Sequence, residues 1–211
     1  MPKSSDFQGL RAFFLRLWRG DPVPKAKDPS EFLSLQGVFS PRHLALLGIM
    51  ATLSAVLSRF TIPLAQNLVL LRFSYLPEFI VGMLLGPWAA LLFGAVADTV
   101  SFLSNPIGAY FPGYALSEML ASLIYACYFY RRPVSLWRAL LARATYIALV
   151  AFGLNYLWDF LLSGKPAASF FTGFRLLNNL IQLPFHALLM TFVGLEARRI
   201  YSRLFAPRQG R

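Results

Sequence analysis

The chain contains little charge and almost no cysteine. Only 14% of its 211 residues are charged and 57% are hydrophobic, whereas soluble domains carry about a quarter of their residues as charged side chains. This composition leaves too little polar surface to cover a soluble globule, so we expect lipid to be the solvent. The single cysteine, Cys127, cannot form an internal disulfide and has no CxxC or nearby histidine partner for a metal.

Motifs for catalysis and for nucleotide hydrolysis are also missing. The sequence has no GxxxxGKS or GxxxxGKT loop, no HExxH motif and no GxSxG elbow. We therefore predict a protein that is not an enzyme and does not bind ATP through a P-loop. No catalytic residue, metal or cofactor is expected.

The positive charges are present, and they are unevenly placed. Of the 20 Lys and Arg residues, 7 lie before or at Arg42, 4 lie between Arg131 and Arg143, and 5 lie from Arg198 onward. Positively charged loops stay on the cytoplasmic side of a bilayer, so these three groups and both termini are expected there. The remaining four are expected near the opposite face, where they would suit an anionic ligand: Arg59, Arg72, Lys165 and Arg175.

The net charge of +11 raises the question of nucleic acid as a partner. The basic residues flank apolar runs and do not interleave with exposed aromatic residues. Anionic lipid of the inner leaflet is therefore the expected partner of these charges, and nucleic acid is not.

Length and apolar runs predict an all-α integral membrane protein with six transmembrane helices, since 211 residues accommodate about six spans of roughly 20 residues. We expect a cytoplasmic basic tail over residues 1–40, a six-helix membrane domain over 41–205 and a basic tail over 206–211. Within the first tail, Gln8–Gly20 suits an amphipathic helix on the membrane surface or, equally, a poorly ordered segment. The expected spans are His43–Phe60, Arg72–Leu85, Trp88–Leu103, a fourth ending near Tyr130, Ala139–Leu162 and Phe170–Tyr201.

Proline and glycine predict where the chain turns. Gly86-Pro87 is a very short cytoplasmic turn, and Thr61–Leu71 and Ser104–Gly113 are expected to be outer loops. Pro184 lies inside the sixth span, so a kink or an interruption is expected around Leu180–Leu183.

Ionisable residues within the spans are candidates for a site, because charge near the bilayer centre is costly. Asp98, Asp159, Arg59 and Arg72 fall in the outer half of the expected spans, and with Arg175 they could surround one outward-facing pocket. The alternative is that the arginines extend to lipid headgroups while the aspartates cap helices or pair with them. For Glu78 and Glu118, internal hydrogen bonding is as good an interpretation as ligand contact, and for His186 it is the better one.

Small residues recur at helical spacing in the first span. Gly48, Ala51 and Ala55 lie on neighbouring turns and form a smooth stripe that lets another helix approach closely. That helix could belong to a partner or, equally well, to this chain.

Four segments together carry a family resemblance. They are AxxxA at Ala51 to Ala55, LSRF at Leu57–Phe60, LRFSYLPEFIVGMLLGPWAALLFGAVAD at Leu71–Asp98, and GAYFPGYALS at Gly108–Ser117. This pattern resembles the folate family of substrate-binding components (S-components) of energy-coupling factor (ECF) transporters. The resemblance implies a six-helix subunit in the bacterial plasma membrane that captures folate or a reduced folate at the extracellular face. It also implies that transport requires a transmembrane coupling subunit and two cytoplasmic ATPases, with Gly48, Ala51 and Ala55 as the expected contact for the coupling subunit.

The chemistry of folate can be matched to the candidate residues. Its tail carboxylates suit Arg59, Arg72 and Arg175, because guanidinium groups bind carboxylates bidentately. Its pterin donors suit the carboxylates and amides of Asp98, Asp159, Asn155 and Asn179. Its rings would stack on aromatic residues of the second outer loop and the following helix, for which the candidates are Tyr110, Phe111 and Tyr114.

Two alternatives remain open from the sequence. The chain could carry another vitamin or precursor, such as pantothenate or thiamine, whose recognition does not require several outer arginines. It could also be a membrane scaffold or a lipid-acting enzyme whose arginines bind headgroups.

Overall fold

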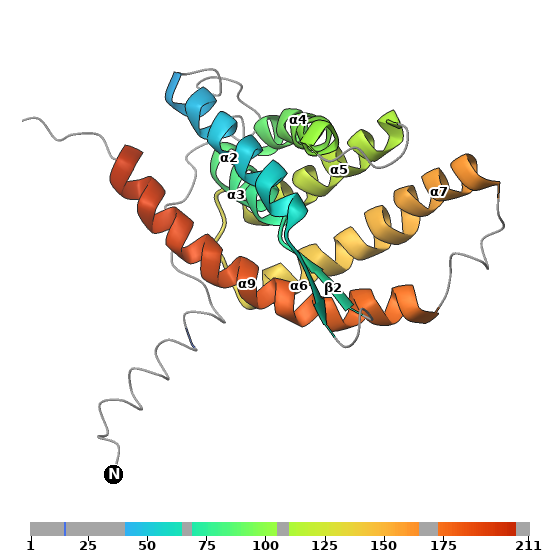
Figure 1. Ribbon diagram of the computed structural model, residues 1–211. Coiled ribbons are helices and arrows are strands. Elements are labelled where there is room, and N and C mark those ends of the chain that lie inside the picture. Colours follow the sequence, from blue (N-terminus) through green and yellow to red (C-terminus); the bar gives the residue numbers. More distant parts are fainter. Residues whose placement is uncertain (1–14, 16–40, 65–68, 105–109, 165–172, 206–211) are drawn as a thin grey trace, which may run out of the picture.

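The computed structural model describes residue 15 and residues 41–64, 69–104, 110–164 and 173–205 (Figure 1). These residues form helices joined by short connections, together with one pair of strands. In chain order the elements are α2 (Pro41–Arg59), β1 (Thr61–Leu64), β2 (Val69–Arg72), α3 (Tyr75–Leu85), α4 (Pro87–Ser104), α5 (Pro112–Phe129), α6 (Leu136–Tyr146), the π-helix η2 (Ile147–Leu154), α7 (Asn155–Ser163) and α9 (Gly173–Phe205).

The expected helical class is confirmed, and the expected span boundaries differ mainly at the first outer loop. That loop contains an antiparallel hairpin in which Thr61 pairs with Arg72 and Leu64 with Val69. Arg72 therefore ends a strand and does not begin the second helix, which starts at Tyr75. The segment is rich in Ile, Leu and Val, and Pro63 cannot continue α2, so a short extended pair replaces a longer helix.

Two proline and glycine signals have different outcomes. Gly86 alone joins α3 to α4, and its φ of 94° lies in the left-handed region that favours glycine, so the very short turn is confirmed. Pro184 lies inside α9, which runs without a break from Gly173 to Phe205, so the expected interruption is wrong, whereas the alternative, a kink, stays a prediction. Membrane helices tolerate an internal proline where neighbouring groups satisfy the backbone that it frees.

The described helices present apolar side chains outward. Three segments are long and apolar enough to cross a membrane, namely Pro87–Ser104, Leu136–Leu162 and Asn178–Ser202, and two shorter helices are also apolar, His43–Arg59 and Tyr75–Leu85. Large exposed residues occur on most helices and include Ile49, Leu92, Leu103, Leu161 and Phe192. Such a surface suits contact with lipid. The total of six spans and the side on which each terminus lies remain predictions.

Helix α3 forms the centre of the helical assembly. It packs against α2, α4, α5 and α9, and most of its residues are buried. Phe79 of α3 contacts Phe129 of α5 edge-to-face with ring centroids 4.9 Å apart. Figure 1 shows α2 to α5 gathered on one side, with the long helices α6–η2–α7 and α9 running along the other.

The predicted tails over residues 1–40 and 206–211 lie outside the described residues, apart from Leu15, which is helical and exposed. Lys165 and the tip of the second outer loop, residues 105–109, also lie outside them. The division of the chain into tails and membrane domain therefore remains a prediction.

Candidate functional site

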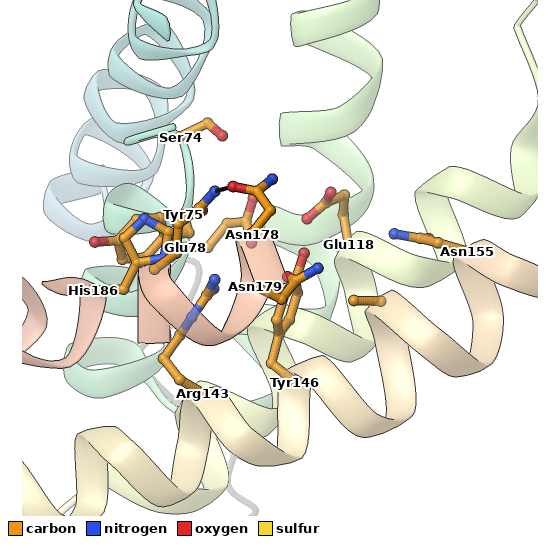
Figure 2. A pocket seen from close by; sticks show the side chains of 12 residues that line it. Ser74, Tyr75, Glu78, Glu118, Arg143, Tyr146, Asn155, Asn178, Asn179 and His186 are labelled. Carbon is orange, nitrogen blue, oxygen red and sulfur yellow. Dashed lines mark hydrogen bonds between the residues drawn. The ribbon is translucent and has the colours of Figure 1, made fainter. Parts of the chain in front are cut away.

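A polar cavity of about 280 Å³ lies where four parts of the fold meet. Helix α3 and the residue before it, α5, the continuous helix α6–η2–α7, and α9 all contribute side chains. Figure 2 shows these side chains converging from several helices. The lining residues are Ser74, Tyr75, Glu78, Glu118, Arg143, Tyr146, Ala151, Asn155, Asn178, Asn179, Gln182 and His186.

Arg143 provides the positive charge of the cavity. Its side chain is buried, and its guanidinium carbon lies 5.1 Å from the ring centroid of Tyr75 and 4.5 Å from that of Tyr146. The guanidinium also donates a hydrogen bond of 2.9 Å to the hydroxyl of Tyr125. Cation–π contacts and this bond hold the guanidinium at a fixed place beside the cavity.

Two carboxyl groups, those of Glu78 and Glu118, also line the cavity. Glu78 is 4% exposed, and it lies on α3, whereas Glu118 lies on α5. Cavity walls that carry one guanidinium and two carboxyl groups can both donate to and accept from a polar ligand.

Several buried polar atoms around the cavity have no hydrogen-bond partner among the described residues. They include both ring nitrogens of His186, the hydroxyl of Tyr75, Nε of Arg143 and Oδ1 of Asn155. His186 is 2% exposed and its ring packs on Tyr75 with centroids 4.5 Å apart. Because buried polar groups are normally hydrogen-bonded, their number here indicates a place for a polar ligand.

Amides form one end of the cavity. Asn178 and Asn179 lie on α9 one turn before Gln182, and Gln182 Nε2 donates a hydrogen bond of 2.6 Å to Oδ1 of Asn178. Asn155 approaches from the first residue of α7. Amide groups carry both donors and acceptors, which suits a heteroaromatic edge.

Of the residues predicted as ligand contacts, Asn155 and Asn179 line this cavity. Asp98 is not among the lining residues and lies partly exposed on α4. Arg59 is exposed, and its guanidinium donates to the carbonyl oxygen of Ser104 at the end of α4. A guanidinium in this position stabilises the carbonyl end of α4.

The other predicted contacts form an aromatic cluster where α5 meets α7. Tyr114 donates a hydrogen bond of 2.7 Å to Asp159, and Phe111 packs edge-to-face on Trp158 with centroids 5.6 Å apart. Tyr110 is 42% exposed and packs against Phe102 of α4. None of the three predicted stacking residues is among the residues that line the cavity.

Arg72 and Arg175 lie on β2 and α9, and their side chains are outside the described part of the chain. Their predicted roles are therefore neither supported nor opposed.

Sequence reasoning assigned Arg143 to the wrong place. It counted Arg143 with the cytoplasmic arginines, whereas the side chain is buried in the cavity. Its position could have indicated this. Arg143 falls within the apolar run Ala139–Leu162, and an arginine inside a membrane span is costly and often belongs to a functional site. His186 and Gln182 also line the cavity and were not among the predicted contacts.

The small residues of α2 are split between two environments. Ala51 and Ala55 are each 8% exposed, and Ala51 packs with Val81 of α3 and Ala89 of α4. Gly48 is exposed, and a Cβ added there would meet no atom within 4 Å. Of these three residues, only Gly48 presents an open surface in the isolated chain.

Comparisons with known proteins give concordant results. A family model described as "ECF transporter, substrate-specific component" matches residues 42–194. The folate transporter FolT of Clostridium novyi is 34% identical over 144 residues, which cover 68% of this chain and 83% of that protein. FolT of Leuconostoc mesenteroides is 29% identical over 149 residues, covering 68% of this chain and 79% of the relative.

A solved structure is also similar. The crystal structure described as FolT bound with folic acid has a TM-score of 0.65 and 30% sequence identity to this chain. The match covers 74% of this chain and 95% of the solved one.

Proposed function

The chain belongs to the family of substrate-specific components of ECF transporters, and from this membership we propose that it binds folate or a reduced folate. It is a multi-pass membrane protein and a transport component, not an enzyme. The observation that carries the proposal is the likeness to FolT bound with folic acid, at 30% identity over most of both chains.

The chemistry of the cavity supports this ligand. Folate has a flat pterin with adjacent donors and acceptors, a benzoyl ring and a glutamate tail with two carboxylates. Amides from α7 and α9, two carboxyl groups and a fixed guanidinium face one cavity, and this mixture suits the pterin better than it suits an aliphatic precursor. A cavity of about 280 Å³ is at the low end for ligand sites, so the ring system would occupy it and the tail would extend outside.

Roles for the individual residues follow from this placement. Asn155 and Asn179 would read the pterin edge, and Arg143 would hold a carbonyl or ring nitrogen. Arg59, Arg72 and Arg175 would attract the tail carboxylates near the outer face, as guanidinium groups do. The aromatic residues Tyr110, Phe111 and Tyr114 would close over the tail and benzoyl ring, and Asp98 and Asp159 would support that outer end.

Delivery would depend on partners. The protein would release folate inward in the bacterial plasma membrane when it assembles with a transmembrane coupling subunit and two cytoplasmic ATPases. The open surface of α2 at Gly48 is the proposed contact for the coupling subunit, with Ala51 and Ala55 keeping the neighbouring helices close behind it. Both termini would be cytoplasmic, where the basic tails meet anionic lipid.

The direct test is calorimetric titration of purified, ligand-stripped protein with folic acid, using riboflavin, thiamine and pantothenate as controls. We expect saturable folate binding without ATP or partner subunits. Arg143→Gln should weaken binding by at least about tenfold, because it removes a charge-assisted hydrogen-bond donor from the cavity.

The matched control is Arg138→Gln. Arg138 lies on the same helix, but it donates to the carbonyl of Pro133 away from the cavity, so folate affinity should not change. Binding of another vitamin in place of folate would contradict the proposed substrate but not the membership of the family. Equal folate affinity in the wild type and in folded Arg143→Gln would exclude the cavity as the site.

A further inference from the structure

The helix that carries Arg143 and Asn155 changes its winding between them. Helix α6 ends at Tyr146, Ile147–Leu154 is π-helical, and α7 begins at Asn155. The N–H of Asn155 donates to the carbonyl of Val150, five residues back. Well under 1% of residues in proteins are π-helical, and such segments occur most often at functional sites.

The winding decides which side chains share the cavity face. Arg143 and Asn155 are twelve residues apart. In an uninterrupted α-helix each residue turns about 100°, so Asn155 would lie roughly 120° around the axis from Arg143. A π-helical segment that takes in one extra residue turns about 100° less than an α-helix of the same number of residues, so η2 brings Asn155 to within about 20° of Arg143.

The other contacts of the helix agree with this geometry. Ala151, inside the π-helical segment, also lines the cavity, and by the same geometry it lies almost directly above Arg143. Beyond the segment, Trp158 donates a hydrogen bond of 3.0 Å to Ser117 of α5, and Asp159 accepts one from Tyr114. Figure 2 shows Arg143, Tyr146 and Asn155 directed to the same cavity.

We propose that the π-helical segment Ile147–Leu154 is a positioning element of the binding site: its extra residue turns Asn155 toward the ligand and keeps α7 against α5. Asn155 is then a specificity-determining residue whose buried Oδ1, without a partner among the described residues, accepts from the ligand. The ligand in this inference is the folate of the proposed function, on which it rests.

Shortening and lengthening the π-helical segment by one residue should have different effects on the direction of Asn155. Deletion of Leu149, which is exposed, leaves Arg143 and Asn155 eleven residues apart. The segment can then rewind toward α-helix, which would place Asn155 roughly 20° from Arg143. Insertion of one alanine after Leu149 cannot be absorbed in this way and rotates Asn155 by roughly 80° or more.

Folate affinity should therefore stay within about threefold after the deletion and fall by more than about tenfold after the insertion. Asn155→Ala in the wild-type length should also lose about tenfold. In an ordinary α-helix, deletion and insertion rotate the following residues equally in opposite directions, so both would be damaging. Deletion of Leu157, another exposed leucine of the same span but within α7, is the control that should be damaging.

A second measurement needs no ligand. With Trp18, Trp88 and Trp137 replaced by phenylalanine, Trp158 alone reports the packing of α7 on Ser117. The wavelength of its fluorescence emission maximum should stay the same after the Leu149 deletion. It should shift after the alanine insertion and after the Leu157 deletion. Failure of the wild type to bind folate would contradict the proposed function. The Trp158 emission of the three length variants would still test whether the π-helical segment positions α7. Equal loss of binding, of the Trp158 signal or of folded protein in the Leu149 deletion and the insertion would overturn the inference.

Discussion

Arg143 lies inside a membrane-spanning helix with its guanidinium against the rings of Tyr75 and Tyr146 and bonded to Tyr125. Aromatic faces and a hydroxyl therefore stabilise a charge that would be costly to bury alone. The neighbouring His186 differs, since neither of its ring nitrogens has a partner among the described residues. At the scale of residues, the guanidinium of Arg143 is fixed in place by its neighbours, whereas the imidazole of His186 could gain a hydrogen bond from a ligand.

The residue prediction concerns His186→Phe. Phenylalanine keeps the ring contact with Tyr75 and removes two buried polar atoms, so thermal stability of the ligand-free protein should be equal or higher. Folate affinity, measured by calorimetry, should fall about tenfold through the lost hydrogen bond.

His43→Phe is the matched control for this substitution. His43 lies 3.1 Å from the hydroxyl of Tyr201, and neither residue is among those that line the cavity. Folate affinity should not respond to it. Unchanged affinity in His186→Phe as well would show that His186 only fills space.

At the scale of elements, the cavity depends on a close crossing of α4 and α5. A Cβ added at Gly94 would lie 2.6 Å from the carbonyl oxygen of Glu118 and 2.6 Å from Cα of Met119. These are backbone atoms, which cannot turn aside as a flexible side chain can. Glycine at this crossing therefore sets the position of the turn of α5 that carries Glu118 into the cavity.

Gly94→Ala should therefore separate the two helices. Overpacking of this kind costs about 1–3 kcal/mol, so we expect a lower Tm and weaker folate binding through the displaced Glu118. The control is Gly48→Ala on α2, where the added methyl meets nothing within 4 Å and stability should be equal or higher, because alanine favours a helix. A Tm for Gly94→Ala equal to that of the wild type would contradict the close crossing.

At the scale of the whole molecule, one polar cavity lies among helices whose outer faces are apolar. The cavity combines charged and amide side chains, whereas exposed leucine, isoleucine and phenylalanine cover the outer faces of the helices. Lipid cannot satisfy polar groups, so the arrangement suits a protein that encloses a polar ligand within a membrane. Binding and assembly with the transport module can then use separate surfaces.

Gly48→Leu tests that separation. The bulky side chain should prevent close approach of a partner helix to α2, so co-purification with the coupling subunit and ATPases should be lost. Folate affinity of the isolated protein should stay within about threefold, since Gly48 is not among the cavity residues. Ala144→Leu places the same leucine side chain at an exposed position of α6 and should preserve assembly. Full assembly of Gly48→Leu would place the coupling contact elsewhere.

The helices and most of their ends could be predicted from the sequence because each is specified locally. Gly86 ends α3 because glycine can adopt the positive φ of the turn, and Pro87 begins α4 because its fixed φ suits the first turn of a helix. The hairpin at Thr61–Leu64 and Val69–Arg72 was missed because it depends on pairing between two short segments. The interruption expected at Pro184 does not occur, since α9 continues through it and membrane helices tolerate an internal proline.

The sequence by itself determined that this is a helical membrane protein, because apolar runs must pair their backbone groups within helices when lipid is the solvent. It also carried the resemblance to the ECF substrate-binding family, through segments such as Leu71–Asp98 and Gly108–Ser117. The tertiary structure alone decided which polar side chains meet. Four separate helices contribute Arg143, Glu78, Glu118 and His186 to the cavity. The sequence shows that these ionisable residues are present but not that they lie close together. The π-helical turn that directs Asn155 inward is also a tertiary result, because its five-residue hydrogen bonds have no residue signature that a local pattern could reveal.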